Sequence, residues 1–112
     1  MTDVLSKYYH AMNAHDVQAA LIYLAPHIEV TFPEAERNWS GRDNAAEKFA
    51  AMFVRMPTFH GSYEVNSVEH LEPGKQLLRV SCRFVCQQSN ADSSRDMEYC
   101  VENDKFTVIR HL

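Results

Sequence analysis

The sequence has no run of apolar residues close to the ~20 that a membrane-spanning helix needs. It also lacks a cluster of basic residues: its eleven Lys and Arg are scattered and are outnumbered by fifteen Asp and Glu, for a net charge of -4. Because affinity for a phosphate backbone comes largely from clustered cations, we expect neither a nucleic-acid nor a membrane partner. Residues 1–4 show no basic segment followed by an apolar stretch, so we expect no secretion signal and a cytoplasmic location.

Cysteine is scarce, and its three copies are typical of a reducing compartment, where cysteine behaves as a small buried hydrophobe. Cys82 and Cys86 are four residues apart in a predicted strand, which puts them on one face but about 13 Å apart, too far for a disulfide. Neither the cysteines nor the six histidines have a metal-ligand spacing such as His-Glu-x-x-His. We therefore expect no metal and no other cofactor.

Residues 1–112 should form one domain, because the chain is too short for two cores and 46% of its residues are apolar. Apolar residues recur every three to four positions near the start, which predicts two helices capped by Asp3 and Asp16. Their apolar positions are Val4, Leu5, Tyr8, Tyr9 and Met12 in the first helix, and Val17, Ala20, Leu21 and Leu24 in the second.

Pro26 should end the second helix, and the alternation from Ile28 to Phe32 predicts a short strand. A polar loop over 33–41 then leads to a third helix, which Ser40 or Asp43 would cap and which stops near Pro57. The apolar face of this third helix consists of Ala46, Phe49, Ala50 and Phe53.

From Phe59 onward the apolar period changes to two, which predicts four strands at 63–71, 76–88, 95–102 and 105–112. The connections between them are rich in turn-forming residues, so an antiparallel meander is the simplest arrangement. Helices first and strands second is the order of an α+β domain with helices packed on one face of the sheet.

Several short motifs in this order resemble a known family. They are Asp-Val at 16–17, Leu-Ala-Pro-His-Ile-Glu-Val-Thr-Phe-Pro at 24–33, Gly-Arg at 41–42, Met-Pro at 56–57 and Glu-Asn-Asp-Lys-Phe at 102–106. Together they resemble the SnoaL-like branch of the nuclear-transport-factor-2-like superfamily over nearly the whole chain. The resemblance implies a cystatin-like cone, with a strongly curved, mostly antiparallel sheet that encloses a pocket, and often a homodimer. Members include isomerases, dehydratases, cyclases and non-enzymatic binding or assembly domains, so the fold alone does not choose a function.

Comparison with ketosteroid isomerase, a member of that superfamily, is informative for what is missing. Tyr8 is similar in place to the oxyanion-hole tyrosine of that enzyme, but Phe32 stands where its general-base aspartate is expected and Met97 where its proton-donating aspartate is expected. Phenylalanine and methionine exchange no protons. Steroid isomerisation by that arrangement is therefore not expected.

By strand alternation, Cys82 and Phe84 share one face of their strand, and Met97 and Tyr99 share one face of the next. The first face should point inward, and the family resemblance implies that the second points into the same interior. There the side chains either line a pocket or simply fill the core. As a pocket they would bind a small apolar molecule. The predicted ligand-binding residues are Phe32, Trp39, Phe53, Cys82, Phe84, Met97 and Tyr99.

The predicted catalytic residues are His60 and Tyr8. His60 begins the sheet near the expected pocket mouth and is either an acid or base or an ordinary strand-end histidine. Tyr8 either donates a hydrogen bond to a ligand oxygen or makes a helix-to-sheet contact. Glu34 and Glu36 are alternative bases or solvated loop charges, and Trp39 is either a lid or an apolar anchor under the loop.

The leading hypothesis is a homodimeric protein that binds a compact apolar molecule bearing a carbonyl or hydroxyl group. If it is an enzyme, it would catalyse a cofactor-free proton transfer of the isomerase, cyclase or dehydratase type. The alternative is a non-enzymatic dimerisation or assembly module whose pocket is filled by its own side chains. A connected cavity would favour a ligand, and a solid core would favour assembly.

Overall fold

All three α-helices precede the last four strands in the computed structural model of the chain, which describes residues 3–87 and 90–112. The helices are α1 (Asp3–Asn13), α2 (Val17–Leu21) and α3 (Arg42–Arg55). A strand β1 (Leu24–Thr31), a 3-10 turn (Ala35–Arg37) and a short β2 (Trp39–Ser40) lie between α2 and α3. The strands that follow α3 are β3 (His60–Glu72), β4 (Lys75–Cys86), β5 (Ala91–Glu102) and β6 (Lys105–His111).

The strands form one six-stranded mixed sheet in the order β2-β1-β6-β5-β4-β3. The predicted antiparallel meander is confirmed, because β3, β4, β5 and β6 pair consecutively and antiparallel. β1 adds to the far side of β6 and runs parallel to it, with Val30 opposite Ile109. The α+β fold predicted from the sequence is confirmed.

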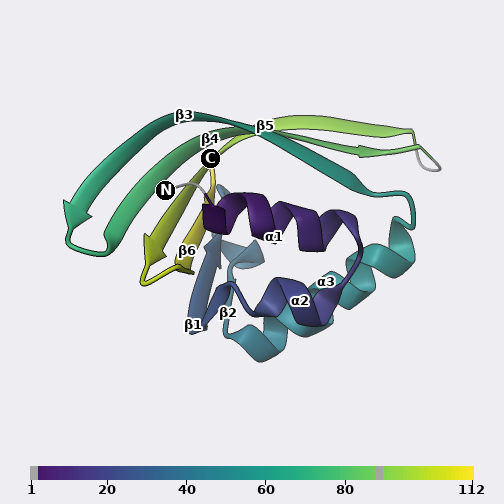
Figure 1. Cartoon of the computed structure of the whole chain (residues 1–112). Helices are drawn as coiled ribbons and strands as arrows, with labels where there is room; N and C mark the ends of the chain where they lie inside the picture. Colours follow the sequence, from purple (N-terminus) through teal and green to yellow (C-terminus); the bar gives the residue numbers. More distant parts are fainter. Residues whose placement is uncertain (1–2, 88–89) are drawn as a thin grey trace.

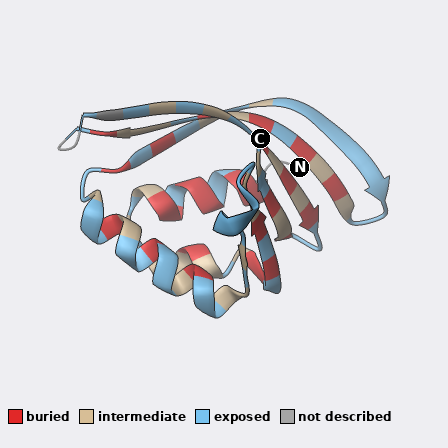
Figure 2. Cartoon of the chain, turned by 180° about the vertical axis from the view of Figure 1, so that it is seen from behind, coloured by how far each residue is buried: buried red, intermediate tan, exposed pale blue. Residues whose placement is uncertain are grey.

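Figure 1 shows that β3, β4 and β5 pass over α1, while α2 and α3 lie on the side of α1 away from these strands. The five residues predicted from the spacing of α1, Val4, Leu5, Tyr8, Tyr9 and Met12, are all buried, and Ala11 is buried with them. Buried positions on α1 and on the strands face one another in Figure 2, which places the core between the helices and the sheet. In the described part of the chain, no helix is long and apolar enough to cross a membrane.

The boundary between α2 and β1 differs from the prediction. Asp16 caps α2 as expected, because its carboxylate accepts a hydrogen bond from the Ala19 N–H at 3.1 Å, but the helix ends at Leu21. Leu24 and Pro26 belong to β1 and not to the helix. Pro26 is exposed and lies where the pairing of β1 with β6 shifts register, so its missing N–H leaves that ladder intact elsewhere.

Two further boundaries are corrected. α3 is capped by neither Ser40 nor Asp43: its N-cap is Gly41, whose φ of 94° suits glycine and whose N–H donates to the Ile28 carbonyl at 2.8 Å. β5 begins at Ala91 rather than 95, because the polar residues that resembled a loop pair with β4. The predicted strand end at 88 and the turn residue at 89 lie outside the described residues, as does the side chain that would cap α1.

Candidate functional site

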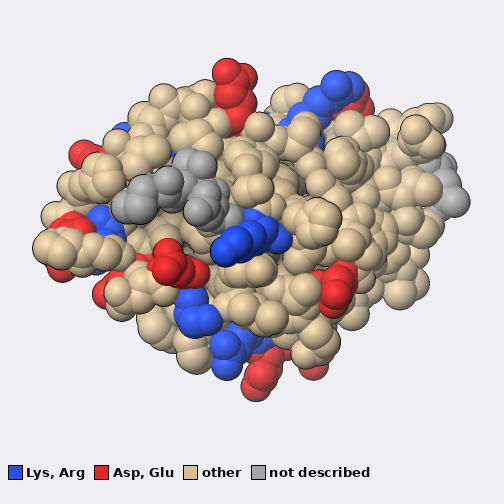
Figure 3. Space-filling view, viewed as in Figure 1, with Lys and Arg blue, Asp and Glu red and all other residues tan. Residues whose placement is uncertain are grey.

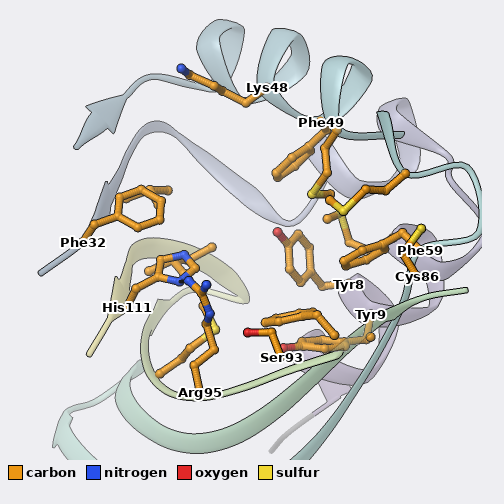
Figure 4. A pocket seen from close by; sticks show the side chains of 18 of the residues that line it. Tyr8, Tyr9, Phe32, Lys48, Phe49, Phe59, Cys86, Ser93, Arg95 and His111 are labelled. Carbon is orange, nitrogen blue, oxygen red and sulfur yellow. Dashed lines mark hydrogen bonds between the residues drawn. The ribbon is translucent and has the colours of Figure 1, made fainter. Parts of the chain in front are cut away.

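A cavity of about 380 Å³ lies between the inner face of the sheet and helices α1 and α3. Its wall is mostly aromatic and methionine side chains, and Figure 4 shows several of them converging on the space from different elements. These residues are Tyr8, Tyr9, Met12, Phe32, Trp39, Phe49, Met52, Met56, Phe59, Phe84, Met97 and Tyr99. The lining is that of a site for an apolar molecule.

Tyr8 on α1 directs its hydroxyl toward the middle of this cavity (Figure 4). Its ring is fixed from two sides, edge-on to Phe106 at a centroid distance of 5.1 Å and tilted against Phe49 at 6.4 Å. Only 6% of the residue is exposed, and this burial raises the pKa of Tyr8 well above its usual value. Within the described part of the chain its hydroxyl has no hydrogen-bond partner. Tyr8 is thus a neutral donor with no acceptor among the described residues.

Tyr9, next along α1, is in the opposite situation. Its hydroxyl lies 2.9 Å from the Cys82 sulfur and 2.9 Å from the Tyr99 hydroxyl, which in turn donates to the Met97 sulfur at 3.6 Å. A hydroxyl has one proton to donate, so Tyr9 donates to Tyr99 and the Cys82 thiol donates to Tyr9. Burial raises the pKa of all three groups, which keeps the chain of hydrogen bonds neutral. This network is satisfied internally.

His111, at the end of β6, is the histidine that reaches the cavity. Its ring stacks on Phe32 at 4.3 Å, and its Nδ1 accepts a hydrogen bond from Arg95 Nη1 at 3.2 Å. Burial, and then the nearby charges of Arg95 and Arg37, lower the pKa of His111 to about 4. The ring is therefore neutral near pH 7, and since Nδ1 accepts, Nε2 carries the proton.

The structure brings six of the predicted site residues to the cavity and leaves three outside its lining. The six are Tyr8, Phe32, Trp39, Phe84, Met97 and Tyr99. Phe53 is buried but stacks on His15 at 4.4 Å, and Cys82 lies behind the wall, bonded to Tyr9. His60 begins β3 as predicted, yet it is exposed. The next residue, Gly61, faces the cavity, and strand alternation turns His60 to the other side.

The alternative bases and the proposed lid also have definite places. Glu34 and Glu36 are exposed and do not line the cavity, and Glu34 lies 3.6 Å from Arg37 in an ion pair. Trp39 is half-buried in β2 and meets Phe49 edge-on at 6.5 Å, so it forms part of the cavity wall.

Sequence reasoning missed Tyr9, Arg95 and His111. Arg95 was within reach, because strand alternation puts it on the same face as Met97 and Tyr99. His111 was not, because the pairing of β5 with β6 shifts register near Cys100 and breaks simple alternation.

The fold agrees with comparisons to known proteins. The sequence profile of the SnoaL-like domain matches residues 5–72, which is more than half of the chain. The chain therefore belongs to the SnoaL-like domain family, within the nuclear-transport-factor-2-like fold. The comparison with curated proteins gives no match.

Solved structures support the same fold at low sequence identity. A domain of unknown function with a cystatin-like fold from Nostoc punctiforme is 14% identical, with a TM-score of 0.82 over 97% of this chain and 72% of that one. A nuclear-transport-factor-2-like protein of unknown function from Shewanella oneidensis is 13% identical, with a TM-score of 0.77 over 98% and 93%. A ketosteroid isomerase-like protein from Erwinia carotovora atroseptica is 13% identical, with a TM-score of 0.67 over 98% and 92%.

Proposed function

We propose that this protein binds a small, largely apolar molecule in the cavity and orients it through an oxygen atom that accepts a hydrogen bond from Tyr8. The observation that carries the proposal is the hydroxyl of the buried residue Tyr8, which faces the cavity and has no hydrogen-bond partner in the described part of the chain. A hydroxyl that faces an otherwise apolar wall can donate to a polar atom of a bound molecule. A carbonyl or hydroxyl oxygen of a ligand would accept that hydrogen bond.

The size and lining of the cavity support a compact ligand. Its volume of about 380 Å³ falls within the range of about 300–1,000 Å³ that is usual for small-molecule sites. An interior filled by its own side chains, as in the alternative of a pure assembly module, would leave no such space. One relative by fold is named a ketosteroid isomerase-like protein, and a ketosteroid is likewise an apolar body that carries a carbonyl.

Binding has more support than catalysis. Proton transfer needs a base within hydrogen-bond reach of the substrate. No carboxylate of the described residues lines the cavity, and His60 is turned away from it. His111 is neutral, but its Nδ1 is occupied by Arg95 and its Nε2 carries a proton, so as placed it donates rather than accepts. Tyr8 and His111 together form a pair of donors suited to holding oxygen atoms.

The test is native mass spectrometry of gently purified wild-type protein and of Tyr8→Phe, followed by denaturing extraction of any small molecule retained. We expect wild type to retain an oxygen-containing apolar compound and Tyr8→Phe to retain less of it at equal stability. His60→Ala is the matched control and should retain as much as wild type. Retention that Tyr8→Phe does not change, or that His60→Ala abolishes, would contradict the proposal.

The expected homodimer is a separate proposal. The outer face of the sheet carries ion pairs from Glu98 to Arg79 at 3.1 Å and to Arg110 at 2.6 Å, and such a polar face suits a hydrated, reversible contact better than a permanent one. Sedimentation velocity over a range of concentrations should show a monomer–dimer equilibrium that weakens in Arg110→Glu. A single monomeric species at every concentration would contradict it.

A further inference from the structure

The charged side chains that line the cavity are all of one sign. Arg37, Lys48, Arg55 and Arg95 contribute to the lining, and no Asp or Glu of the described residues does. The chain as a whole has the opposite balance, with fifteen acidic residues against eleven basic ones. On the face seen in Figure 3 the two signs are interspersed. The cavity is therefore a positive region in a negatively charged protein.

Arg95 is the cation most deeply placed in this region. It is half-buried, and its side chain points from β5 toward His111 (Figure 4). The three other arginines of the sheet, Arg79, Arg83 and Arg110, are each ion-paired with Glu98 or Asp92. Among the described residues Arg95 has no carboxylate partner, and the hydrogen bond that it makes is to the neutral His111.

An unpaired guanidinium in a partly buried site is unfavourable unless another group neutralises it. A guanidinium has five N–H donors in a planar fork that matches a carboxylate or a related oxyanion. Arg95 donates one of these hydrogen bonds to His111 Nδ1, which leaves its other N–H donors for an anion.

Arg37 supplies a second charge at this end of the cavity. Its guanidinium lies over the Phe32 ring at 4.4 Å, and that ring stacks on His111. Its ion pair with Glu34 is long, at 3.6 Å, and both side chains are about half exposed, so the pair contributes little. The charge of Arg37 therefore remains available to an anion bound at Arg95. The lowered pKa of His111, caused in part by Arg95 and Arg37, agrees with a positive potential here.

From this geometry we infer that the ligand is an organic acid: an apolar body in contact with the aromatic wall and Tyr8, and an acidic group held by Arg95 with the help of Arg37. The inference rests on the proposed function, which supplies the apolar binding site, and adds the chemical class of the ligand. Lys48 and Arg55 are exposed on α3 and contribute only longer-range attraction.

The test uses two probes with the same apolar skeleton. 1-Anilinonaphthalene-8-sulfonate carries an acidic group, and N-phenyl-1-naphthylamine is its neutral counterpart. Trp39 is the single tryptophan of the chain and lines the cavity, so quenching of its fluorescence reports binding at this site. We expect the sulfonate to bind about tenfold more tightly than the neutral probe, as a charge-assisted hydrogen bond predicts. Added salt should weaken the binding of the sulfonate but not that of the neutral probe.

The variants separate the cavity charge from the total charge. Arg95→Gln should weaken binding of the sulfonate about tenfold and should change the affinity for the neutral probe by less than about twofold. Arg37 lies on an exposed turn, where a substitution does not put folding at risk. Arg37→Gln should weaken binding of the sulfonate about threefold, and it provides the same test if Arg95→Gln does not fold. Arg79→Gln removes the same charge from the outer face and should change neither affinity.

The possible results separate the inference from the proposed function on which it rests. A sulfonate preference that Arg95→Gln or Arg37→Gln removes, and that Arg79→Gln leaves intact, supports the inference. Equal affinity of the two probes, or a preference that only total charge affects, overturns the inference while the proposed binding function stands. Binding of neither probe overturns both.

Discussion

The two faces of the sheet treat charge in different ways. On the outer face Arg79 and Arg110 share the carboxylate of Glu98, and Arg83 makes two hydrogen bonds to Asp92 at 3.0 and 2.7 Å. On the inner face Arg95 meets a neutral histidine instead. The outer charges neutralise one another within the protein, whereas the charge of Arg95 is left for a bound group to neutralise.

The same division appears within α1. Tyr9 is bonded on both sides of its hydroxyl, while the hydroxyl of Tyr8, one residue earlier, points into open space. Tyr9 is therefore satisfied within the protein, whereas the hydroxyl of Tyr8 and the charge of Arg95 are left without a partner of their own at the cavity. Each prediction below tests whether a residue belongs to the first class or to the second.

The largest effect is expected at Phe106, which is fully buried and lies 5.1 Å from the rings of both Tyr8 and Tyr99. Phe106→Ala should lower the free energy of unfolding by about 3–5 kcal/mol, because it removes a large side chain and leaves a void under both tyrosines. Urea unfolding measures this. Thr107→Ala, next along β6 and half-buried, is the control, and a similar loss in both variants would contradict the prediction.

The next effect distinguishes the two neighbouring tyrosines. Tyr9→Phe should lower the free energy of unfolding by about 1–2 kcal/mol, because the Cys82 thiol and the Tyr99 hydroxyl each lose a hydrogen-bond partner in a buried site. Tyr8→Phe should change it by less than about 0.5 kcal/mol, since its hydroxyl has no partner to lose. Denaturant unfolding of both variants checks this, and equal losses would remove the distinction between them.

A smaller effect concerns pH. The pKa of His111 is about 4 in the folded protein and near 6.5 for the free side chain, so the folded state binds fewer protons between these values. The stability associated with the neutral His111 ring is therefore fully present above about pH 6.5 and is lost as the pH falls toward about 4. Because the ring is only partly buried, solvent screening limits the loss to the order of 1 kcal/mol.

His111→Gln should flatten this part of the stability profile, which urea unfolding at about pH 7 and about pH 4.5 measures. His60→Gln, which removes an exposed histidine, should keep the wild-type profile. An unchanged slope in His111→Gln would show that other groups govern the acid sensitivity.

The smallest effect is expected on the outer face. Arg79 is about half exposed, with 49% of its side chain accessible, and Arg79→Gln should lower the free energy of unfolding by no more than about 0.5 kcal/mol. Glu98 keeps its contact with Arg110 in this variant, which limits the loss further. A loss of more than about 2 kcal/mol, measured by thermal unfolding, would mean that the outer ion pairs are structural after all.

Much of the fold followed from local patterns in the sequence. The spacing of apolar residues on α1 and the strict alternation of β4, with Leu78, Val80 and Cys82 all buried, are consequences of helix and strand geometry that one segment displays by itself. Features that depend on pairing between distant segments could not be predicted in this way. The parallel pairing of β1 with β6, and the inclusion of Leu24 in that strand, depend on a partner about 80 residues away along the chain.

The site divides in the same way. Phe84 and Met97 were found because strand alternation fixes which face they occupy, and Tyr8 because of its helical spacing and the family resemblance. His60 was placed near the cavity by its position in the chain, and a difference of one residue in a pleated strand turned it outward. His111 reaches the cavity because of a register shift between β5 and β6, which only cross-strand pairing reveals.

The position of β6 at the centre of the sheet has a consequence for synthesis on the ribosome. β1 is made early, but apart from the two-residue β2 its ladder partner is β6, which follows all the other described strands along the chain. Until β6 has emerged, the nascent chain presents an unpaired apolar strand edge, which is a place for misassociation. Joining an early strand to the latest one also closes a very long loop, so folding should be slow for a protein of this size and should end, cooperatively, with the docking of β6.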